Sequence, residues 1–300
     1  MKSNEINFRT DLADERVDVY KKHHKLSEVN GVLITNKEEK EYKLTCVEVT
    51  NEEGEKALNK PIGKYITMQL NDLMYTEEEE KQKIIEVLSG QIKDLIKDLE
   101  NKPVLIVGLG NKDATPDAIG PGTVEHLDIT RHLIKYAKNL VKEDAREISA
   151  IAPGVLGTTG IETSEIVHSI VKKIKPGFVI AIDSLASQSI ERVAKCIQLS
   201  NTGISPGSGV KNKREGLNFE ALGIPVIALG LPTVVDMATI TSDAISRVYN
   251  ENNMYKKVAE ILDTENYMVT PKEIDIIVQI ISEILASSLN VALRLTSRGK

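Results

Sequence analysis

The stretch PVLIVGLGNKDATPDAIGP, residues 103–121, decides the fold of this chain. It opens with a continuous apolar run rich in β-branched residues, Val104–Val107, which predicts a fully buried strand. A glycine-rich turn follows, at which the backbone can bend sharply, and Asp117 comes next in a loop. Because open α/β sheets bind their ligands at the carboxyl ends of strands, Asp117 is a candidate functional residue.

A second apolar segment, Phe178–Ile182, runs directly into Asp183 and repeats this arrangement. Two acids that lie close together share a proton, so the pair could activate a water molecule and protonate a leaving group. With a neutral histidine such as His126, the same acids could instead bind a divalent metal. Asp113 and Asp236 also follow predicted strands, where aspartate commonly caps the next helix. The residues alone leave these alternatives open.

From residue 103 onward the pattern alternates strands with helices, which predicts an α/β fold with a mostly parallel sheet and helices on both faces. We expect a β-rich segment at about residues 31–70 and an α/β core over about residues 76–300. Residues 1–30 have little apolar periodicity and are expected to form an arm. Other expected elements are a helix opened by a capping box at Thr76 and Glu79, a helix over about 124–141, strands at 148–151 and 225–229, and a last helix after Pro271.

The composition is that of an ordinary globular protein, with 41% hydrophobic and 27% charged residues among 300. The sequence has no run of about eighteen apolar residues and no signal-peptide pattern, so we expect a cytoplasmic protein. Cys46 and Cys196 are far apart and outside any CxxC pair, which disfavours a disulfide framework or a zinc site. The net charge of −6 argues against nonspecific binding of nucleic acid.

The glycines after the first core strand do not fit the nucleotide-binding fingerprints. The dinucleotide motif G-x-G-x-x-G needs a third glycine where Asp113 stands, and no Gly-Lys-Ser/Thr sequence follows for a P-loop. A second glycine-rich stretch, residues 203–214, is also basic. It could form an anion-binding nest or be a flexible surface loop, and the sequence favours neither.

Several longer motifs occur in fixed order: VGLGN, ATPDAIGP, APGVLGTTGIETSEI, FVIAIDSLAS, SNTGISPGSGVKNKR and LGIPVIALGLPTVVD. On these motifs the chain resembles the germination protease family of spore-forming bacteria, and the resemblance runs from RTDLA near the start to VTPKEID before the last helix. It implies a three-layer α/β/α sandwich similar to the hydrogenase-maturation peptidases, with a β-rich N-terminal extension.

The resemblance also implies an activity. Family members are atypical aspartic endopeptidases that degrade small acid-soluble spore proteins at germination, assemble as homotetramers and act in the spore core. Their two essential acids correspond to Asp117 in ATPDAIGP and Asp183 in AIDSLAS. The hydrogenase-maturation peptidases use such acids with a histidine to recognise a bound metal, and this chain has no clear counterpart of that histidine. The resemblance therefore implies no metal and no cofactor. From the net charge and the absence of a long apolar run we expect no direct nucleic-acid partner and no membrane partner.

Family members are made as zymogens that mature by self-cleavage, and they cut proteins after Glu or Asp and before a hydrophobic residue followed by alanine. Asp11, Leu12 and Ala13 fit this pattern, so residues 1–11 would be a propeptide and residues 12–300 a single peptidase domain. The family prefers an acid at the fourth residue before the cut, where this chain has phenylalanine, so the bond should be cut more slowly than one in a substrate. We expect a flexible arm to carry this bond into the active site.

Two other functions stay open at this stage. One is a metal-recognising maturation peptidase of the same fold. The other is a nonenzymatic module that binds anions or peptides through residues 203–214.

Overall fold

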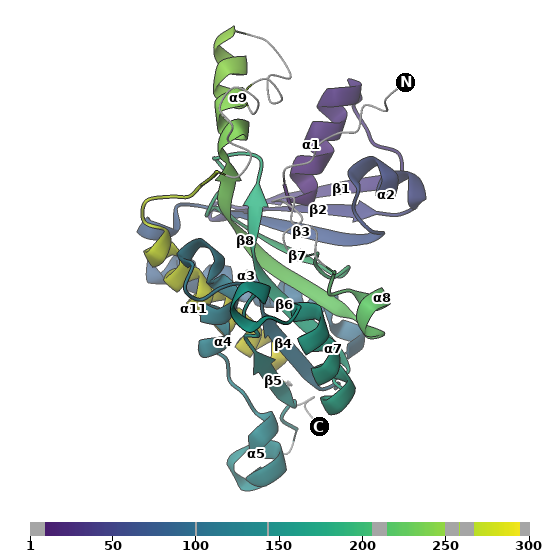
Figure 1. Cartoon of the computed structure of the whole chain (residues 1–300), viewed down its shortest axis with the longest axis vertical. Coiled ribbons are helices and arrows are strands. Elements are labelled where there is room, and N and C mark those ends of the chain that lie inside the picture. Colours follow the sequence, from purple (N-terminus) through teal and green to yellow (C-terminus); the bar gives the residue numbers. More distant parts are fainter. Residues whose placement is uncertain are drawn as a thin grey trace.

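The computed structural model describes residues 10–99, 101–142, 144–205, 215–249, 258 and 267–294. Within these residues a nine-stranded sheet runs through the molecule in the order β1-β2-β3-β7-β8-β6-β4-β5, with β9 paired to β8 (Figure 1). Its strands are β1 (Val32–Glu38), β2 (Tyr42–Val49), β3 (Gly63–Leu70), β4 (Val104–Gly108), β5 (Ile148–Ile151), β6 (Phe178–Ser187), β7 (Cys196–Ser200), β8 (Val226–Asp236) and β9 (Met268–Val269).

The strands β5, β4, β6 and β8 are parallel to one another and form the centre of the sheet. They confirm the parallel strands predicted from residue 103 onward. β1, β2 and β3 pair antiparallel and join the same sheet through β7, which is itself antiparallel to β8. The β-rich N-terminal segment is therefore an extension of the central sheet, as expected.

Helices cover both faces of this sheet and complete a three-layer sandwich. They are α1 (Ala13–His24), α2 (Glu52–Leu58), α3 (Glu78–Leu95), α4 (Ile119–Glu125), α5 (Arg131–Tyr136), α6 (Leu156–Thr159), α7 (Thr163–Ile174), α8 (Phe219–Leu222), α9 (Met237–Tyr249) and α11 (Ile274–Leu293), with the 3-10 turns η1 (Leu73–Tyr75), η2 (Lys97–Leu99), η3 (Thr115–Asp117) and η4 (Lys138–Leu140). Along β4 the side chains alternate between layers. Val104 and Ile106 pack with α3, α4 and α11, whereas Leu105 and Val107 pack with α7 and α8. A strand that is covered on both faces has apolar side chains on both, and this explains the continuous apolar run in the sequence.

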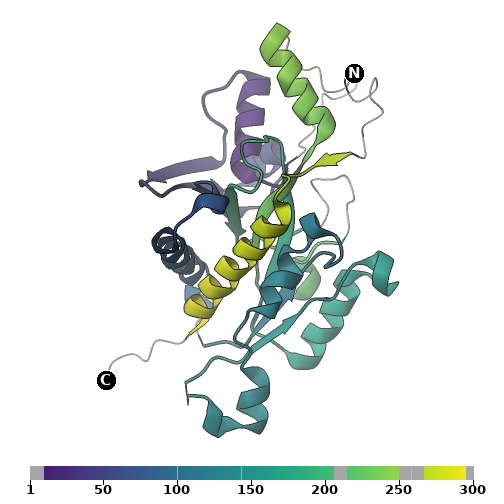
Figure 2. The same cartoon turned by 90° about the vertical axis from the view of Figure 1, so that its left-hand side faces the viewer.

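α11 is long and apolar enough to cross a membrane by length and composition alone. In this fold it is a core helix that lies beside α3 and α4, with 61% of its most apolar stretch buried (Figure 2). Ile281, Leu285 and Leu289 are fully shielded from solvent. Packing against the sheet thus accounts for its apolar character.

The expectation of an N-terminal arm is wrong for residues 10–24. Residues from Ala13 onward form α1, and Thr10 and Leu12 are completely buried. Polar contacts, such as the hydrogen bond from the Gln188 N–H to Glu15, hold the start of this helix, so hydrophobic periodicity could not reveal it. Residues 1–9, which are most of the expected propeptide, lie outside the described residues.

Two predicted helices also differ from the structure. The single helix expected over residues 124–141 is two helices, α4 and α5, because the backbone between them bonds elsewhere: the Thr130 N–H donates to the Ile148 carbonyl at 3.2 Å. The capping box expected at Thr76 is absent. The Thr76 hydroxyl donates to the Asp72 carbonyl at 2.9 Å, and α3 begins two residues later.

β6 and β8 run further than the apolar segments that predicted them. The strands were expected to end at Ile182 and Leu229, but β6 continues to Ser187 and β8 to Asp236. Beyond the end of β4 the two strands keep pairing with each other, with one shift of register. Asp183 therefore lies inside a strand and not on a loop.

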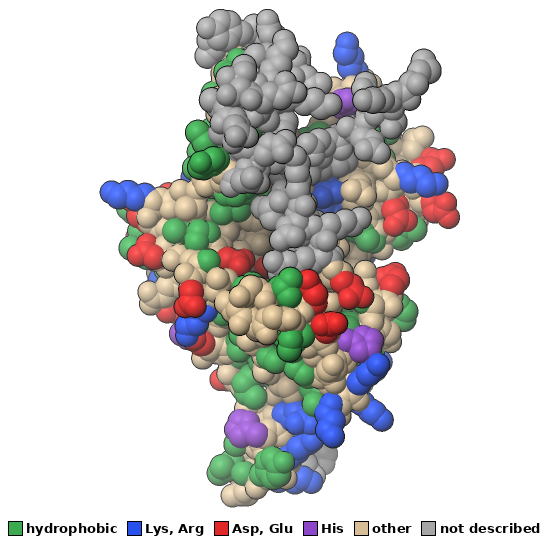
Figure 3. Space-filling view, viewed as in Figure 1, with side chains coloured by type: hydrophobic (Ala, Val, Ile, Leu, Met, Phe, Trp, Pro, Cys, Tyr) green, Lys and Arg blue, Asp and Glu red, His purple; other side chains and the backbone are tan. Residues whose placement is uncertain are grey.

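α5 and η4 project from one end of the molecule, where basic and histidine side chains gather (Figure 3). None of their residues is buried, and the side chains of Tyr136 and Leu140 are 87% and 68% exposed. Most helices of a globular protein bury one face against a neighbour. Within the described chain, α5 has no such buried face.

Candidate active site

Asp117 is held by the turn that follows β4. Gly110 has a φ of 112°, and a Cβ atom at that position would come within 2.0 Å of the Asp117 carbonyl oxygen. The backbone of this turn therefore approaches η3 more closely than any residue but glycine allows. The Asn111 N–H donates to Oδ2 of Asp117 at 2.8 Å, which fixes the carboxylate against the turn.

Asp183 lies in the middle of β6 and is 7% exposed. Its Oδ1 accepts a hydrogen bond from the Ser184 N–H at 2.9 Å. In the sheet register Asp183 pairs with Gly230 of β8, and Gly230 pairs in turn with Gln198 of β7. Paired residues point to the same face of a sheet, so Asp183 and Gln198 lie in one row on either side of Gly230. The Leu185 side chain fills the space that a side chain at Gly230 would occupy.

The structure brings the two predicted acids to the same region. The Leu109 N–H, just after β4, donates to the Ile182 carbonyl at 2.7 Å, so the turn starts beside Asp183. η3, which carries Asp117, lies against both β6 and β8. We expected the acids that follow two neighbouring strands to lie in the same region, and they do. Asp183, however, lies within its strand and not after it.

The chain segment around Asp11 also reaches this region. The Asp11 N–H donates to the Ala186 carbonyl, and the Ala186 N–H donates to Oδ2 of Asp11, both at 2.9 Å. Backbone groups of residues an even number apart along a strand point to the same edge, so Ala186 and Ile182 use the same edge of β6. Asp11 therefore occupies the place beside β6 that β4 would occupy if β4 were longer. Asp11 thus lies next to the strand that carries Asp183.

Side chains of Lys60 and Gln198 form hydrogen bonds to the backbone on both sides of the peptide bond between Asp11 and Leu12. The carbonyl oxygen of Asp11 accepts hydrogen bonds from Lys60 Nζ at 2.8 Å and from Gln198 Nε2 at 2.9 Å. The Ala13 N–H, two residues later, donates to Oε1 of the same Gln198 at 2.7 Å. Because Gln198 shares its row and its face with Asp183, this peptide bond lies on the same side of the sheet as that acid.

An apolar pocket holds the Leu12 side chain. Leu12 packs against Leu185 and Cys196, with Ile204 at the margin, and is completely buried. Burial raises the pKa of the Cys196 thiol, so this cysteine is a neutral, apolar wall of the pocket. Ala13 is also completely buried. A hydrophobic residue followed by a small one is what this part of the site accommodates.

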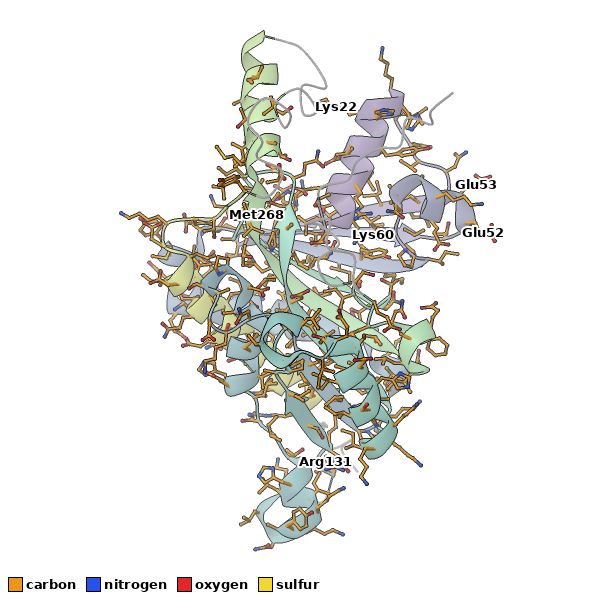
Figure 4. All side chains as sticks on the ribbon, in the orientation of Figure 1. Lys22, Glu52, Glu53, Lys60, Arg131 and Met268 are labelled. Carbon is orange, nitrogen blue, oxygen red and sulfur yellow. The ribbon has the colours of Figure 1, made fainter. Side chains whose placement is uncertain are left out.

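Lys60 brings a positively charged group to that peptide bond. In Figure 4 it lies beside the start of α1, just after α2. The residue is partly exposed, but burial of its ammonium group and the nearby Arg16 guanidinium lower its pKa to about 7, and the Asp11 carboxylate offsets part of this effect. The ammonium also lies 5.5 Å from the centre of the Tyr65 ring. Lys60 can thus lose its charge near neutral pH.

The first turn of α1 fixes the residues on either side of the Asp11–Leu12 bond. Arg16 Nε and Nη2 donate to the Thr10 carbonyl at 3.1 and 2.9 Å. The Glu15 carboxylate accepts from the Thr10 hydroxyl and from the backbone N–H groups of Gln188 and Ser189. Burial raises the pKa of Glu15 above its ordinary value. The segment from Thr10 to Arg16 is therefore an ordered, buried part of the site.

The other candidate residues lie elsewhere or serve the fold. Oδ1 of Asp236 accepts from the Thr239 N–H at 3.0 Å, which is the helix-capping role. Asp113 is exposed in the turn after β4, and His126 is exposed at the end of α4. Among the described residues, no three His, Cys, Asp or Glu side chains are grouped so as to hold a metal ion. Most of the basic loop, residues 206–214, lies outside the described residues.

Three groups that contact the Asp11–Leu12 segment could not be found from the sequence: Lys60, Gln198 and the backbone of Ala186. No motif marks them, since Lys60 is one of many surface-type lysines and Gln198 stands in an otherwise apolar strand. A polar residue within an apolar strand was the one available signal. Its partner could be identified only after the order of the strands was known.

Comparison with known proteins identifies the family of this chain. A sequence profile described as germination protease matches residues 9–260. The germination protease of Clostridium perfringens is 46% identical over 96% of this chain and 95% of the relative. That of Clostridium tetani is 42% identical over 96% of both chains, and that of Priestia megaterium is 38% identical over 96% of this chain and 94% of the relative.

A solved structure of a NiFe hydrogenase maturation protease from Thermococcus kodakarensis is 15% identical, covers 66% of this chain and 98% of its own, and has a TM-score of 0.35. The family profile covers most of the chain, and the relatives match over nearly all of it. This chain therefore belongs to the germination protease family.

Proposed function

We propose that this protein is an aspartic endopeptidase that begins the degradation of small acid-soluble spore proteins in the spore core at germination. Family membership supports a protease of spore germination. The catalytic type rests on one observation: the turn after β4 carries Asp117 back against β6, the strand that holds Asp183. Two carboxyl groups that share a proton can supply both a base and an acid.

In this mechanism one carboxylate takes a proton from a water molecule that attacks the peptide carbonyl. The protonated partner then gives a proton to the departing nitrogen, so that hydrolysis needs no metal. The chain would act first on itself, between Asp11 and Leu12. This leaves residues 1–11 as a propeptide and residues 12–300 as the mature enzyme. In support, the Asp11 carboxylate, the Leu12 side chain and the Ala13 backbone each have a fitted partner beside Asp183.

Substitution of the acids tests the catalytic assignment. Asp117→Asn and Asp183→Asn should each abolish cleavage of a small acid-soluble spore protein while the thermal unfolding midpoint stays near that of the parent. Asparagine is nearly isosteric, so packing survives, but the proton transfers cannot occur. Capping acid Asp236 lies outside the proposed pair, and Asp236→Asn is the control that should keep its activity. Near-normal turnover in either dyad variant, lost on chelation, would favour the metal-recognising peptidase instead.

Maturation is tested on the purified full-length chain. We expect mild acid to start cleavage between Asp11 and Leu12, with faster processing below about pH 6, where carboxyl groups begin to hold protons. Asp11→Lys should block processing because it removes the carboxylate that the Ala186 N–H binds and brings a second ammonium next to Lys60. Intact mass and N-terminal sequencing identify the product. Trimming of the Asp183→Asn variant at this bond would assign the cut to another protease.

A further inference from the structure

Two side chains outside the proposed dyad bind the oxygen of the bond that is to be cut. Lys60 Nζ and Gln198 Nε2 both donate to the Asp11 carbonyl, at 2.8 and 2.9 Å. They come from separate parts of the chain, one after α2 and the other in β7. Donors that stabilise an oxyanion in hydrolases lie about 2.7–3.1 Å from the oxygen that becomes charged.

We propose that Lys60 and Gln198 are further catalytic residues, which stabilise the negative charge that develops on the Asp11 carbonyl oxygen during self-cleavage. This inference rests on the proposed function, since it assumes that the Asp11–Leu12 bond is the one cut and that the two acids activate the water.

The reaction then runs in two balanced steps. The water oxygen forms a bond to the Asp11 carbonyl carbon, its proton passes to a carboxylate of the dyad, and the carbonyl electron pair moves onto the oxygen between Lys60 and Gln198. Next the carbonyl re-forms, the carbon–nitrogen bond breaks, and the Leu12 nitrogen takes a proton from the dyad. One water molecule is consumed, and no oxidant or reductant is needed.

Gln198 suits this role because its amide donates and accepts at the same time. Its Nε2 binds the carbonyl on one side of the bond, and its Oε1 binds the Ala13 N–H on the other. A single planar amide therefore binds the backbone on both sides of Leu12. Glutamate at this position has the same shape but offers no donor when ionised, so its charge would face the carbonyl oxygen.

Lys60 suits the role because its ammonium is partly desolvated, which strengthens its effect on a developing charge. The charged and titratable groups that face it are Asp11, Arg16 and Tyr65. With a pKa of about 7, Lys60 is charged at lower pH and becomes neutral as the pH rises through 7. The stabilising charge is thus present under the acidic conditions at which the dyad is expected to work.

The experiment follows processing of the full-length chain by intact mass from pH 5 to pH 8.5, in the parent and in Lys60→Met, Lys60→Arg and Gln198→Glu. We expect Lys60→Met and Gln198→Glu to slow processing about a hundredfold or more. Arginine stays charged over this range, so the ratio of the Lys60→Arg rate to the parent rate should be constant below pH 6. Above pH 7 it should rise by about tenfold per pH unit. Lys64→Met, which changes an exposed lysine of β3, is the matched control and should process like the parent.

The same substitutions in an Asp183→Asn background, where no cut occurs, separate catalysis from folding through their unfolding midpoints. If Lys60→Met fails to fold there, the isosteric Gln198→Glu decides the question. The proposal is overturned by parent-like processing in Gln198→Glu or Lys60→Met. It is equally overturned by a Lys60→Arg ratio that does not change with pH. Processing that persists in Asp183→Asn alone assigns the cut to another protease and refutes self-cleavage, the part of the proposed function on which this inference rests. A blocked Asp183→Asn with a fully active Lys60→Met leaves self-cleavage standing and refutes the role of Lys60.

Discussion

At the scale of single residues, Lys60 couples the stability of the unprocessed chain to pH. Its pKa is about 7 in the folded chain and 10.5 without the fold. Below pH 7 both states hold the proton, so Lys60 adds no dependence on pH there. Between pH 7 and 10.5 only the unfolded chain keeps the proton, and the free energy of unfolding therefore rises with pH.

The prediction is a comparison between two chains that cannot process, Asp183→Asn alone and Asp183→Asn with Lys60→Met. Urea unfolding at pH 6, 7, 8 and 9 should show the chain that retains Lys60 gaining stability relative to the other from pH 7 upward. A constant difference between the two across this range would mean that the ammonium is fully hydrated in the folded chain.

Sequence can single out a residue that stands at a recognisable place on an element. Asp117 and Asp183 were proposed because each comes after a continuous apolar run, and their catalytic role stays a prediction. Lys60 and Gln198 were not found, because their importance comes from the atoms that they meet across the fold. A lysine with a lowered pKa has the same sequence context as one in water, since burial is a property of the tertiary structure.

At the scale of elements, the turn after β4 is the part most sensitive to substitution. A Cβ atom on Gly110 would lie 2.0 Å from the Asp117 carbonyl oxygen, and the positive φ of this residue disfavours any other side chain. Gly110→Ala must displace η3 and with it the Asp117 carboxylate. We expect turnover to fall by at least about a hundredfold, since small misplacements of catalytic groups have effects of that size.

Gly90→Ala is the matched control for this prediction. Gly90 lies in α3, and a Cβ atom there meets nothing within 4 Å. Alanine should leave activity unchanged and raise the free energy of unfolding by about 0.5–1 kcal/mol, as expected for a helix interior. Steady-state assays and urea unfolding on both variants check the pair. Full activity in Gly110→Ala would show that the turn tolerates a shift of η3.

Elements stabilised by local apolar patterns were predicted well, and those stabilised by distant polar contacts were not. The apolar runs of β4 and β6 gave strands at the expected places. α1 was taken for an arm because Glu15 and Arg16 find their partners in other parts of the chain. β6 was predicted too short because its second half is held by pairing with β8 and contains polar residues.

At the scale of the whole molecule, alternation of strands and helices predicted the parallel centre of the sheet but could not give the order of its strands. β7 lies between β3 and β8 and pairs with both. β3 and β8 are far from β7 in the sequence, so local patterns could not predict these pairings. That order places Gln198 in one row with Asp183, across Gly230. The candidate site is thus a product of topology, and only its acids could be anticipated.

The homotetramer implied by family resemblance leads to a prediction about α5. This helix and η4 bury none of their residues, and exposed apolar side chains commonly mark contacts between proteins. If another copy of this chain covers them, Tyr136→Glu with Leu140→Glu should lower the particle mass measured by sedimentation. Tyr75→Glu, at a tyrosine that is 85% exposed on η1, is the control that should leave the mass unchanged. An unchanged particle mass in the double variant would mean that no contact between copies depends on these two side chains.

The position of Leu12 just before the first residue of α1 determines how the new chain end behaves after cleavage. The proposed hydrolysis would turn its peptide nitrogen into a free ammonium at the positive end of a helix dipole, on a residue that is completely buried. The Thr10 hydroxyl that accepts the Leu12 N–H leaves with the propeptide, while Asp14 and Glu15 are engaged by Arg192 and by backbone N–H groups. If the chain cuts itself as proposed, we expect the new chain end to move toward solvent and to leave the pocket between Leu185 and Cys196 open to the next chain.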